Sequence, residues 1–381
     1  MSGRVLTGAI TLIVLLGAAV FLFTVFEKKQ KQYSLTDPNA TVEVGLRTSN
    51  PDFSEGARMM DSGKFGEAIT KFQSALEHTQ DPAQEAVVMM HLAVSKEKNN
   101  LFADYAQAVP ILKEIVRNQK YPAISRAYAA QELGLMSAVF VDPKLDDVIY
   151  ADAPFNTMRV SGDNPMTWRN IFQYAASIYP LGASEAQVAR WYSNKLIESD
   201  RETAPDKKLP PQIFAQYKQE VKDRLAVATR DIQRIKGNVS EAAYVPQALS
   251  LMALSVGRMQ LLGETSYGDM KDLYTRALEG YQAIGASPYQ DGFTRYNYAV
   301  LTAKLSTSTN SGASAILAPF YTTKNYSKSP VERFLKNAHA NDDTYKNDYA
   351  NIILLTKADS KFMEYLKTIG WQSSDFSKSK N

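Results

Sequence analysis

Few side chains in this chain could take part in acid–base or metal chemistry. Among its 381 residues there are three histidines and no cysteine, which excludes disulfides, thiolate metal sites and a cysteine nucleophile. His91 falls on an apolar helical face and His78 at the expected end of a helix, where a histidine is typically structural. Asp342 and Asp343 follow His339, but they are well placed to cap a helix at its N-terminus. The histidines therefore predict neither a catalytic nor a metal site.

Carboxylates gather between residues 141 and 163, in a stretch without helical periodicity that we interpret as an irregular insertion. They lack the spacing and the glycine of a calcium loop, so we interpret them as a solvated loop face: Asp142, Asp146, Asp147 and Asp152. The chain also lacks the G-x-S-x-G, P-loop, H-E-x-x-H and Rossmann motifs. The sequence therefore predicts no enzymatic activity, no cofactor and no metal. The rival hypothesis is an enzyme or enzyme subunit acting on envelope glycans, with acids such as Glu132 or Asp147 in the chemistry.

Aromatic side chains are the more promising material for binding. The chain has 21 tyrosines and three tryptophans, and most of them fall on apolar helical stripes, where they are expected to pack between helices. Amphipathic rings are also favoured in binding surfaces, and the candidates to line a groove are Trp168, Trp191 and Tyr192. A net charge of +3 without a long Lys/Arg block excludes a nucleic-acid footprint. The classes of ligand that remain are a protein, a peptide, a glycan and a small ligand.

The elements that must position these residues are helices. Asp81 and Pro82 open one apolar-faced segment, Asn164 and Pro165 open another, and a long helix is expected from Pro211 to Lys236. Alternation with a period of two, which would indicate strands, is essentially absent. The Pro-rich, charged segment at 199–211 is the best internal boundary, so we expect one helical repeat region at 55–198, a linker, and a second region at 212–381.

One helical stripe recurs. After the turn at Gly63, Phe65 begins a run whose apolar residues fall at +3, +4, +7, +10 and +11, as on one face of a helix. At 267–284 the same kind of stripe returns, and "LYTRALE" at 273–279 aligns closely with "KFQSALE" at 71–77. A recurring amphipathic hairpin predicts a stacked array, because each hairpin needs neighbours to bury its second face.

The residue order in these hairpins resembles the tetratricopeptide repeat (TPR), in which small residues and aromatics alternate along two helices. The matching positions are Gly56, Met59, Gly63, Phe65, Ala68, Phe72 and Ala75, with Tyr274 and Ala277 in the second copy. In the second copy the first helix, around Leu254 to Leu261, needs a one-residue shift. The resemblance implies an all-α, TPR-like right-handed superhelix of helical hairpins, in which small residues allow close helix approach.

The N-terminus predicts a membrane anchor. From Val5 to Phe26 there are 22 residues without a charge, about 33 Å as a helix, which matches a bilayer core. The run continues directly into Glu27, without the small residues of a signal-peptide cleavage site. We expect one uncleaved transmembrane signal anchor at 1–30, a stalk or linker at 31–54, and an extracytoplasmic (periplasmic or cell-surface) helical region.

These observations predict a membrane-anchored scaffold or adaptor that binds a protein or peptide partner at the membrane surface. The alternatives are a glycan or small-ligand binding protein, or a non-catalytic subunit of an envelope enzyme complex. The oligomeric state stays open.

Overall fold

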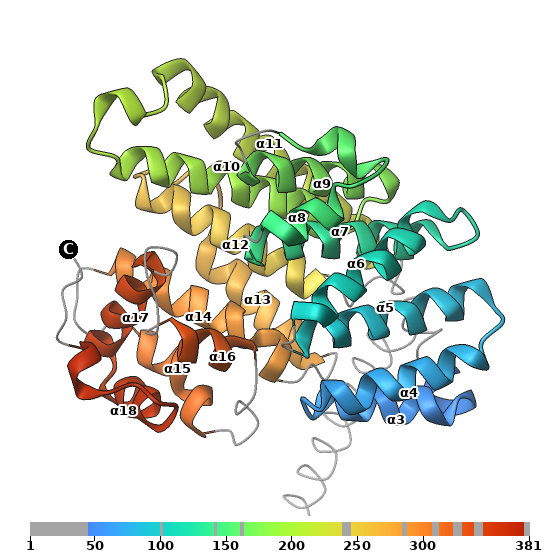
Figure 1. Cartoon of the computed structure of the whole chain (residues 1–381). Coiled ribbons are helices and arrows are strands. Elements are labelled where there is room, and N and C mark those ends of the chain that lie inside the picture. The colour runs from blue at the N-terminus through green and yellow to red at the C-terminus, as the bar shows by residue number, and fades with distance from the viewer. Residues whose placement is uncertain are drawn as a thin grey trace, which may run out of the picture.

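The computed structural model describes residues 45–99, 102–140, 143–160, 164–237, 245–283, 288–306, 312–322, 330–338 and 346–376. All regular structure in these ranges is helical, and none of it is strand, which confirms the all-α fold class. In Figure 1 the helical hairpins follow one another in chain order around an arc, from blue at the lower right through green at the top to red at the lower left.

The α-helices are α3 (Pro51–Asp61), α4 (Phe65–Glu77), α5 (Pro82–Lys98), α6 (Phe102–Arg117), α7 (Ala123–Phe140), α8 (Pro143–Ile149), α9 (Asn164–Ile178), α10 (Ala183–Arg201), α11 (Pro211–Gly237), α12 (Val245–Leu261), α13 (Met270–Ala283), α14 (Pro288–Leu305), α15 (Ala313–Thr322), α16 (Pro330–Asn337), α17 (Lys346–Ala358) and α18 (Ser360–Thr368). Short 3₁₀ helices occur at η1 (Phe155–Met158), η2 (Pro205–Lys207) and η6 (Ser373–Phe376).

Helix packing follows the chain order. Neighbours in sequence pack on one another, as in α3–α4, α5–α6, α10–α11 and α12–α13. The first helices of successive hairpins also contact each other, from α10 to α12, from α12 to α14 and from α14 to α17. A hydrogen bond connects α7 and α10, in which the Ser184 hydroxyl donates to Gln131 Oε1 at 2.8 Å. We call α3, α5, α7, α10, α12, α14 and α17 the leading row.

Small residues set the distance between helices at both copies of the recurring stripe. A Cβ placed on Gly56 would lie 2.9 Å from Cε1 of Phe72, and one on Gly257 would lie 2.6 Å from both Met270 Sδ and Leu301 Cδ1. In α4 the buried positions are Phe65, Ala68, Phe72 and Ala75, and in α13 they are Met270, Tyr274 and Ala277. Met59 is partly buried beside the first set, and Gly63 adopts a φ of 73° in the turn.

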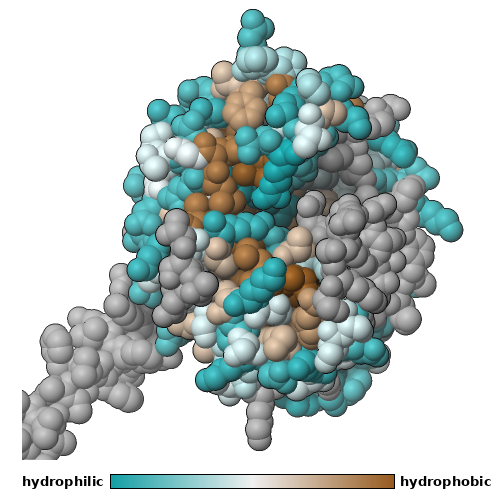
Figure 2. All heavy atoms as spheres, turned by 90° about the vertical axis from the view of Figure 1, so that its left-hand side faces the viewer, coloured by the Kyte–Doolittle hydropathy of each residue, from teal (hydrophilic) through white to brown (hydrophobic). Residues whose placement is uncertain are grey.

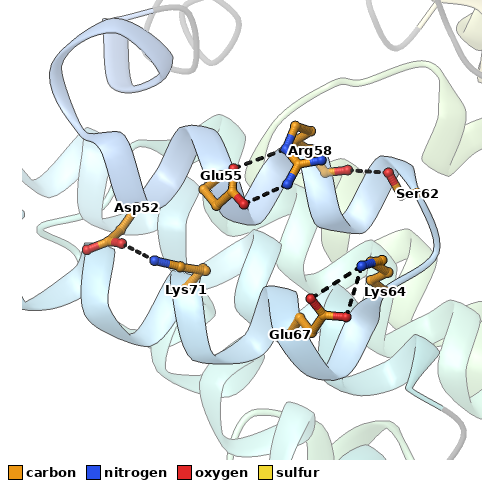
Figure 3. A network of polar contacts seen from close by, with 7 residues as sticks. All are labelled: Asp52, Glu55, Arg58, Ser62, Lys64, Glu67 and Lys71. Atoms are coloured by element: carbon orange, nitrogen blue, oxygen red, sulfur yellow. Dashed lines mark hydrogen bonds and ion pairs between the residues drawn. The ribbon is translucent and has the colours of Figure 1, made fainter.

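The outer side of the α3–α4 hairpin carries charges that compensate one another. Figure 3 shows Asp52 beside Lys71 and Glu55 beside Arg58, with nitrogen–oxygen distances of 2.8 and 2.6 Å. Hydrogen bonds from Lys71 and Ser74 lower the pKa of the Asp52 carboxyl. Pairs this exposed contribute little to stability. They provide an example in this protein of surface charges that are each paired with an opposite charge.

The structure corrects the interpretation of residues 141–163 as an irregular, solvated insertion. Within it, α8 and η1 form a folded unit whose apolar side chains lie in the core with α6 and α7: Leu145, Ile149, Tyr150 and Phe155. Asp146 is buried and accepts a hydrogen bond from the Ser137 hydroxyl at 3.0 Å. Because that hydroxyl also accepts from Tyr150 at 2.9 Å, Asp146 belongs to an internal network and not to a solvated face. Asp142 lies outside the described residues.

The expected boundaries of the array also shift. From residue 45 the predicted stalk is already helical. Leu46 is buried against the α3–α4 hairpin, and Phe53, which belongs to α3, is buried in the same core. At the other predicted boundary, α10 continues to Arg201, and the Ser199 hydroxyl accepts a hydrogen bond from the Leu209 amide at 2.9 Å. The helices on either side, α10 and α11, share one hydrophobic core.

The predicted anchor at Val5–Phe26 lies outside the described residues. No helix in the part of the chain that the structure describes is long and apolar enough to cross a membrane.

Candidate functional site

Two of the three predicted groove residues lie in the core. Trp191 is 2% exposed and Tyr192 is 6% exposed, and both rings pack against Tyr217 of α11, with centroids 5.6 and 5.0 Å away. The Arg169 guanidinium lies 4.7 Å from the Trp191 ring centroid on another side. These two rings are therefore enclosed by their own chain. Trp168 is only partly buried, and it stacks edge-on against Phe172.

A group of three cationic side chains lies beside Trp168. The Arg190 guanidinium of α10 lies 5.6 Å from the Trp168 ring centroid. Arg258 of α12 donates from Nη1 to the backbone carbonyl of Arg190 at 3.1 Å. Lys304 of α14 is close enough that the positive charge of Arg258 acts on it. These three residues, which we call the cationic cluster, are half-buried and stand on three successive helices of the leading row.

The cationic cluster lacks carboxylate partners. Within the described residues, none of its three side chains forms an ion pair, in contrast to the charged side chains in Figure 3, each of which is paired with one of opposite sign. Glu198 and Asp348 act on Arg258 and Lys304 from a distance, and Arg201 adds a further positive charge. Partly buried cations are usually paired, because removing them from water is costly. The local charge balance is therefore positive.

Burial also changes the acidity of these groups. It lowers the pKa of Arg190 to about 10, with a further contribution from the charge of Arg258. Burial lowers the pKa of Arg258 to about 10 as well. For Lys304, burial and the charges of Arg201 and Arg258 lower the pKa to about 8. The causes are those expected when desolvated like charges approach one another, and at neutral pH all three groups remain mainly protonated.

Buried polar atoms without hydrogen-bond partners lie next to the cationic cluster. Gln187, one turn before Arg190 on α10, is 1% exposed, and its Oε1 has no partner among the described residues. The same holds for the hydroxyl of Tyr274, whose ring is fully buried and which lies close enough to Arg258 to interact with it electrostatically. Orphaned buried polar atoms are rare in native proteins. They indicate a place where water or a ligand completes the hydrogen bonding.

The two acids of the rival enzyme hypothesis, Glu132 and Asp147, differ from each other in their surroundings. Glu132 of α7 is buried, which raises the pKa of its carboxyl, and it shares a hydrogen bond with Glu97 of α5. Asp147 of α8 is exposed and pairs with Arg159 at 2.8 Å. Of two described pockets, one of about 970 Å³ lies between α15, α16 and α18, and one of about 310 Å³ lies between α11, α12 and α13. Neither is lined by Glu97 or Glu132.

The histidines have structural surroundings where the structure describes them. The ring of His91 packs between Phe53 and Phe72, with centroids 5.0 and 5.4 Å away, and its Nδ1 lies 2.9 Å from the Val87 carbonyl. His78 occupies the C-cap of α4. His339 lies outside the described residues. Across the described ranges, no group of three or more His, Asp or Glu side chains has a geometry that could hold a metal ion.

The cationic cluster was missed by sequence reasoning, although one signal was present. Arg258 is the only charged residue between Val245 and Leu261, in an otherwise apolar helix. Burying a single charged side chain on such a helix costs folding free energy unless the charge is paired. A charge of this kind is therefore a signal of a possible functional role. The separations in sequence, from Arg190 to Arg258 and on to Lys304, gave no reason to group the three residues.

Comparison of the chain with protein-family models, with curated proteins and with solved structures gives no match. The residues and geometry above are therefore the basis for assigning a function.

Proposed function

We propose that this protein is a membrane-tethered scaffold that holds a protein or peptide partner along the leading row of a TPR-like superhelix. The observation that carries the proposal is the cationic cluster, three half-buried charges on successive helices without carboxylate partners in the described part of the chain. A site of this kind suits binding, because it offers donors and positive charge without a nucleophile or a base beside them.

The hairpin array supports the same proposal. Helices that stack in chain order present a long surface built from the first helix of each hairpin, and such surfaces are used for binding extended partners. The close approaches at Gly56 and Gly257 are the kind of contact that the TPR pattern requires. The side of the molecule in Figure 2 combines hydrophilic side chains with apolar patches near its middle.

The tether is proposed from the sequence. The apolar run from Val5 to Phe26 is long enough to span a bilayer, and an array that begins near residue 45 would stand close to the membrane surface. We propose an extracytoplasmic position for it, with the short N-terminal head in the cytoplasm. Such a protein would gather a partner at the membrane.

Site-specific photo-crosslinking in native membranes tests the proposal. A photoreactive residue in place of Asn194, one helical turn from Arg190 on α10, should give a defined adduct with a partner protein. A matched position on the second helix of the same hairpin, Gln219 of α11, should not. Adducts from Gln219 alone, or from neither position, would contradict binding along the leading row.

The alternative, a glycan or small-ligand binding protein, is favoured by a different observation. The pocket of about 970 Å³ is lined by the rings of Phe320, Tyr321 and Tyr365, and the Tyr365 hydroxyl donates to Glu332 at 3.2 Å. Aromatic faces with adjacent acids suit sugar rings. Binding to an array of cell-envelope glycans that is lost on Tyr365→Ala, but kept when Arg258 is replaced, would favour this alternative.

A further inference from the structure

We propose that the cationic cluster docks an extended acidic segment of the partner protein, and that the segment's carboxylates bind to Arg190, Arg258 and Lys304. This inference rests on the proposed function and gives the partner a chemistry. It commits to an acidic polypeptide, and it treats inorganic phosphate and other small anions as outcomes of the test.

The charge of the site selects an anion. Three desolvated cations near Arg201 are opposed within the described residues only by Glu198 and Asp348, neither of which forms an ion pair with them. Glu198 is itself paired with Lys195 at 3.1 Å. In a partly buried setting like charges repel more strongly than in water. An incoming carboxylate would remove that repulsion and gain charge-assisted hydrogen bonds from the guanidinium groups.

The extent of the site favours a chain over a small ion. Packed helices lie about 8–10 Å apart, so a cluster on α10, α12 and α14 covers roughly 16–20 Å. A single phosphate can contact only part of it. A polypeptide in the polyproline II conformation rises about 3.1 Å per residue and completes a turn every three residues. About six residues would therefore cross all three helices, with acids three residues apart on the side that faces the three cations.

The surroundings of the cluster suit a polypeptide as well. Gln187 Oε1 is a buried acceptor without a partner among the described residues, and it lies one turn from Arg190. Because this oxygen is enclosed in the core, an ordered water beside the cluster is the partner that suits it, and it does not by itself discriminate between a polypeptide and a small anion. On α14 the stripe that ends at Lys304 also carries Phe293, one of the few large apolar side chains that are exposed, at 40%. Phe293 lies 11 residues, or about 16 Å, from Lys304 along α14, so an apolar residue beyond the acids, at the end of a longer segment, would contact it.

Fluorescence anisotropy with fluorescein-labelled deca-glutamate, added to the full-length protein in detergent, tests the inference. We expect saturable binding that weakens as salt rises. The triple variant Arg190→Gln/Arg258→Gln/Lys304→Gln should bind at least about tenfold more weakly. The matched control replaces two exposed cations elsewhere, Lys207→Gln/Arg230→Gln, and should change the affinity by less than about twofold.

A second measurement separates loss of binding from loss of folding. Because Arg258→Gln removes a desolvated charge that is repelled by its neighbours, the unliganded variant should melt at the same temperature as the wild type or higher. At the same concentration, deca-glutamate should raise the melting temperature of the wild type more than that of the triple variant. A lower melting temperature for unliganded Arg258→Gln would overturn the inference, because it would give this arginine a structural role.

The remaining outcomes are equally decisive. Absence of deca-glutamate binding, or equal weakening in the cluster variant and in the control, would overturn the inference. So would displacement of the peptide by inorganic phosphate at equal concentration, because the site would then be one for a small anion. If the peptide fails to bind while Asn194 still crosslinks to a partner, this inference fails and the proposed scaffold function stands. If both experiments fail, both proposals fall.

Discussion

Replacement of Gly56 by alanine tests whether the close packing of α3 on α4 sets the geometry of the first hairpin. In an open helical position this change stabilises a helix by about 1 kcal/mol. Here the new methyl group would lie 2.9 and 3.0 Å from two ring carbons of Phe72 and 3.2 Å from Cβ of Lys71. The ring has little room to move, because Phe72 is fully buried and packs on Phe53 and His91.

The expected effect follows from the two opposing contributions. Overpacking of a core costs about 1–3 kcal/mol. With three short contacts we take the upper end, so that after the helix-propensity gain Gly56→Ala should destabilise the hairpin by about 2 kcal/mol. Terminal hairpins of stacked arrays can open locally. A loss of 2 kcal/mol should therefore make the protected amides of α3 and α4 exchange with deuterium about 30-fold faster.

Gly66→Ala is the matched control for that measurement. Gly66 lies in α4, and its nearest atom to a new Cβ is Asn99 Oδ1 at 3.5 Å, which is ordinary contact. This variant should slow amide exchange in the hairpin or leave it unchanged. Unchanged or slower exchange in Gly56→Ala would refute the reasoning, since it would show that the helices separate freely at this position.

Three further predictions concern titration and capping. The pKa of Lys304 is about 8 in the fold, below the value of about 10.4 expected in the unfolded chain. Because the charged form of Lys304 opposes folding, the wild type should gain stability relative to Lys304→Met as the pH rises from about 8 to 10.5, which urea denaturation measures. Arg117 and Lys113 lower the pKa of Asp152 to about 2 from 3.8. The wild type should therefore be more stable than Asp152→Asn above about pH 4, and this difference in stability should disappear as the pH falls toward about 2. In thermal denaturation, the melting temperatures of the two proteins should then converge. Asp81 accepts hydrogen bonds from two backbone amides at the start of α5, and Asp81→Ala should cost about 1 kcal/mol in the same urea assay.

Much of the fold could be predicted because the residues that start, pattern and end each helix lie within or next to that helix. The long helix expected from Pro211 to Lys236 occurs as α11, Pro211–Gly237, since its proline start, apolar stripe and terminal glycine all lie within the element. The cap predicted at Asp81 is also confirmed, with Pro82 in the first turn. Such signals depend on neighbouring residues, so they can be read without the tertiary structure.

The region of α8 could not be predicted because its stability comes from distant residues. The segment around Asp146 reads as polar and irregular, but Ser137 and Tyr150 form the hydrogen bonds that allow the carboxylate to be buried. Buried polar groups depend on partners in other elements, and no local pattern identifies those partners.

The candidate site was beyond sequence reasoning for the same reason. The prediction of a groove followed aromatic residues, and two of these, Trp191 and Tyr192, are in the core because rings on apolar stripes usually pack between helices. The cationic cluster comes from three helices far apart in sequence, which the order of hairpins brings together. Its one local signal was Arg258, alone in an apolar helix.

The measurement that tests the account most directly is the crystal structure of the full-length protein with deca-glutamate bound. We predict an extended peptide across α10, α12 and α14, with carboxylate oxygens at hydrogen-bond distance, about 2.7–3.2 Å, from the guanidinium groups of Arg190 and Arg258. A peptide bound in the pocket beside Lys336 and Lys361, or on α11 and α13 with Arg190 and Arg258 unoccupied, would contradict the account.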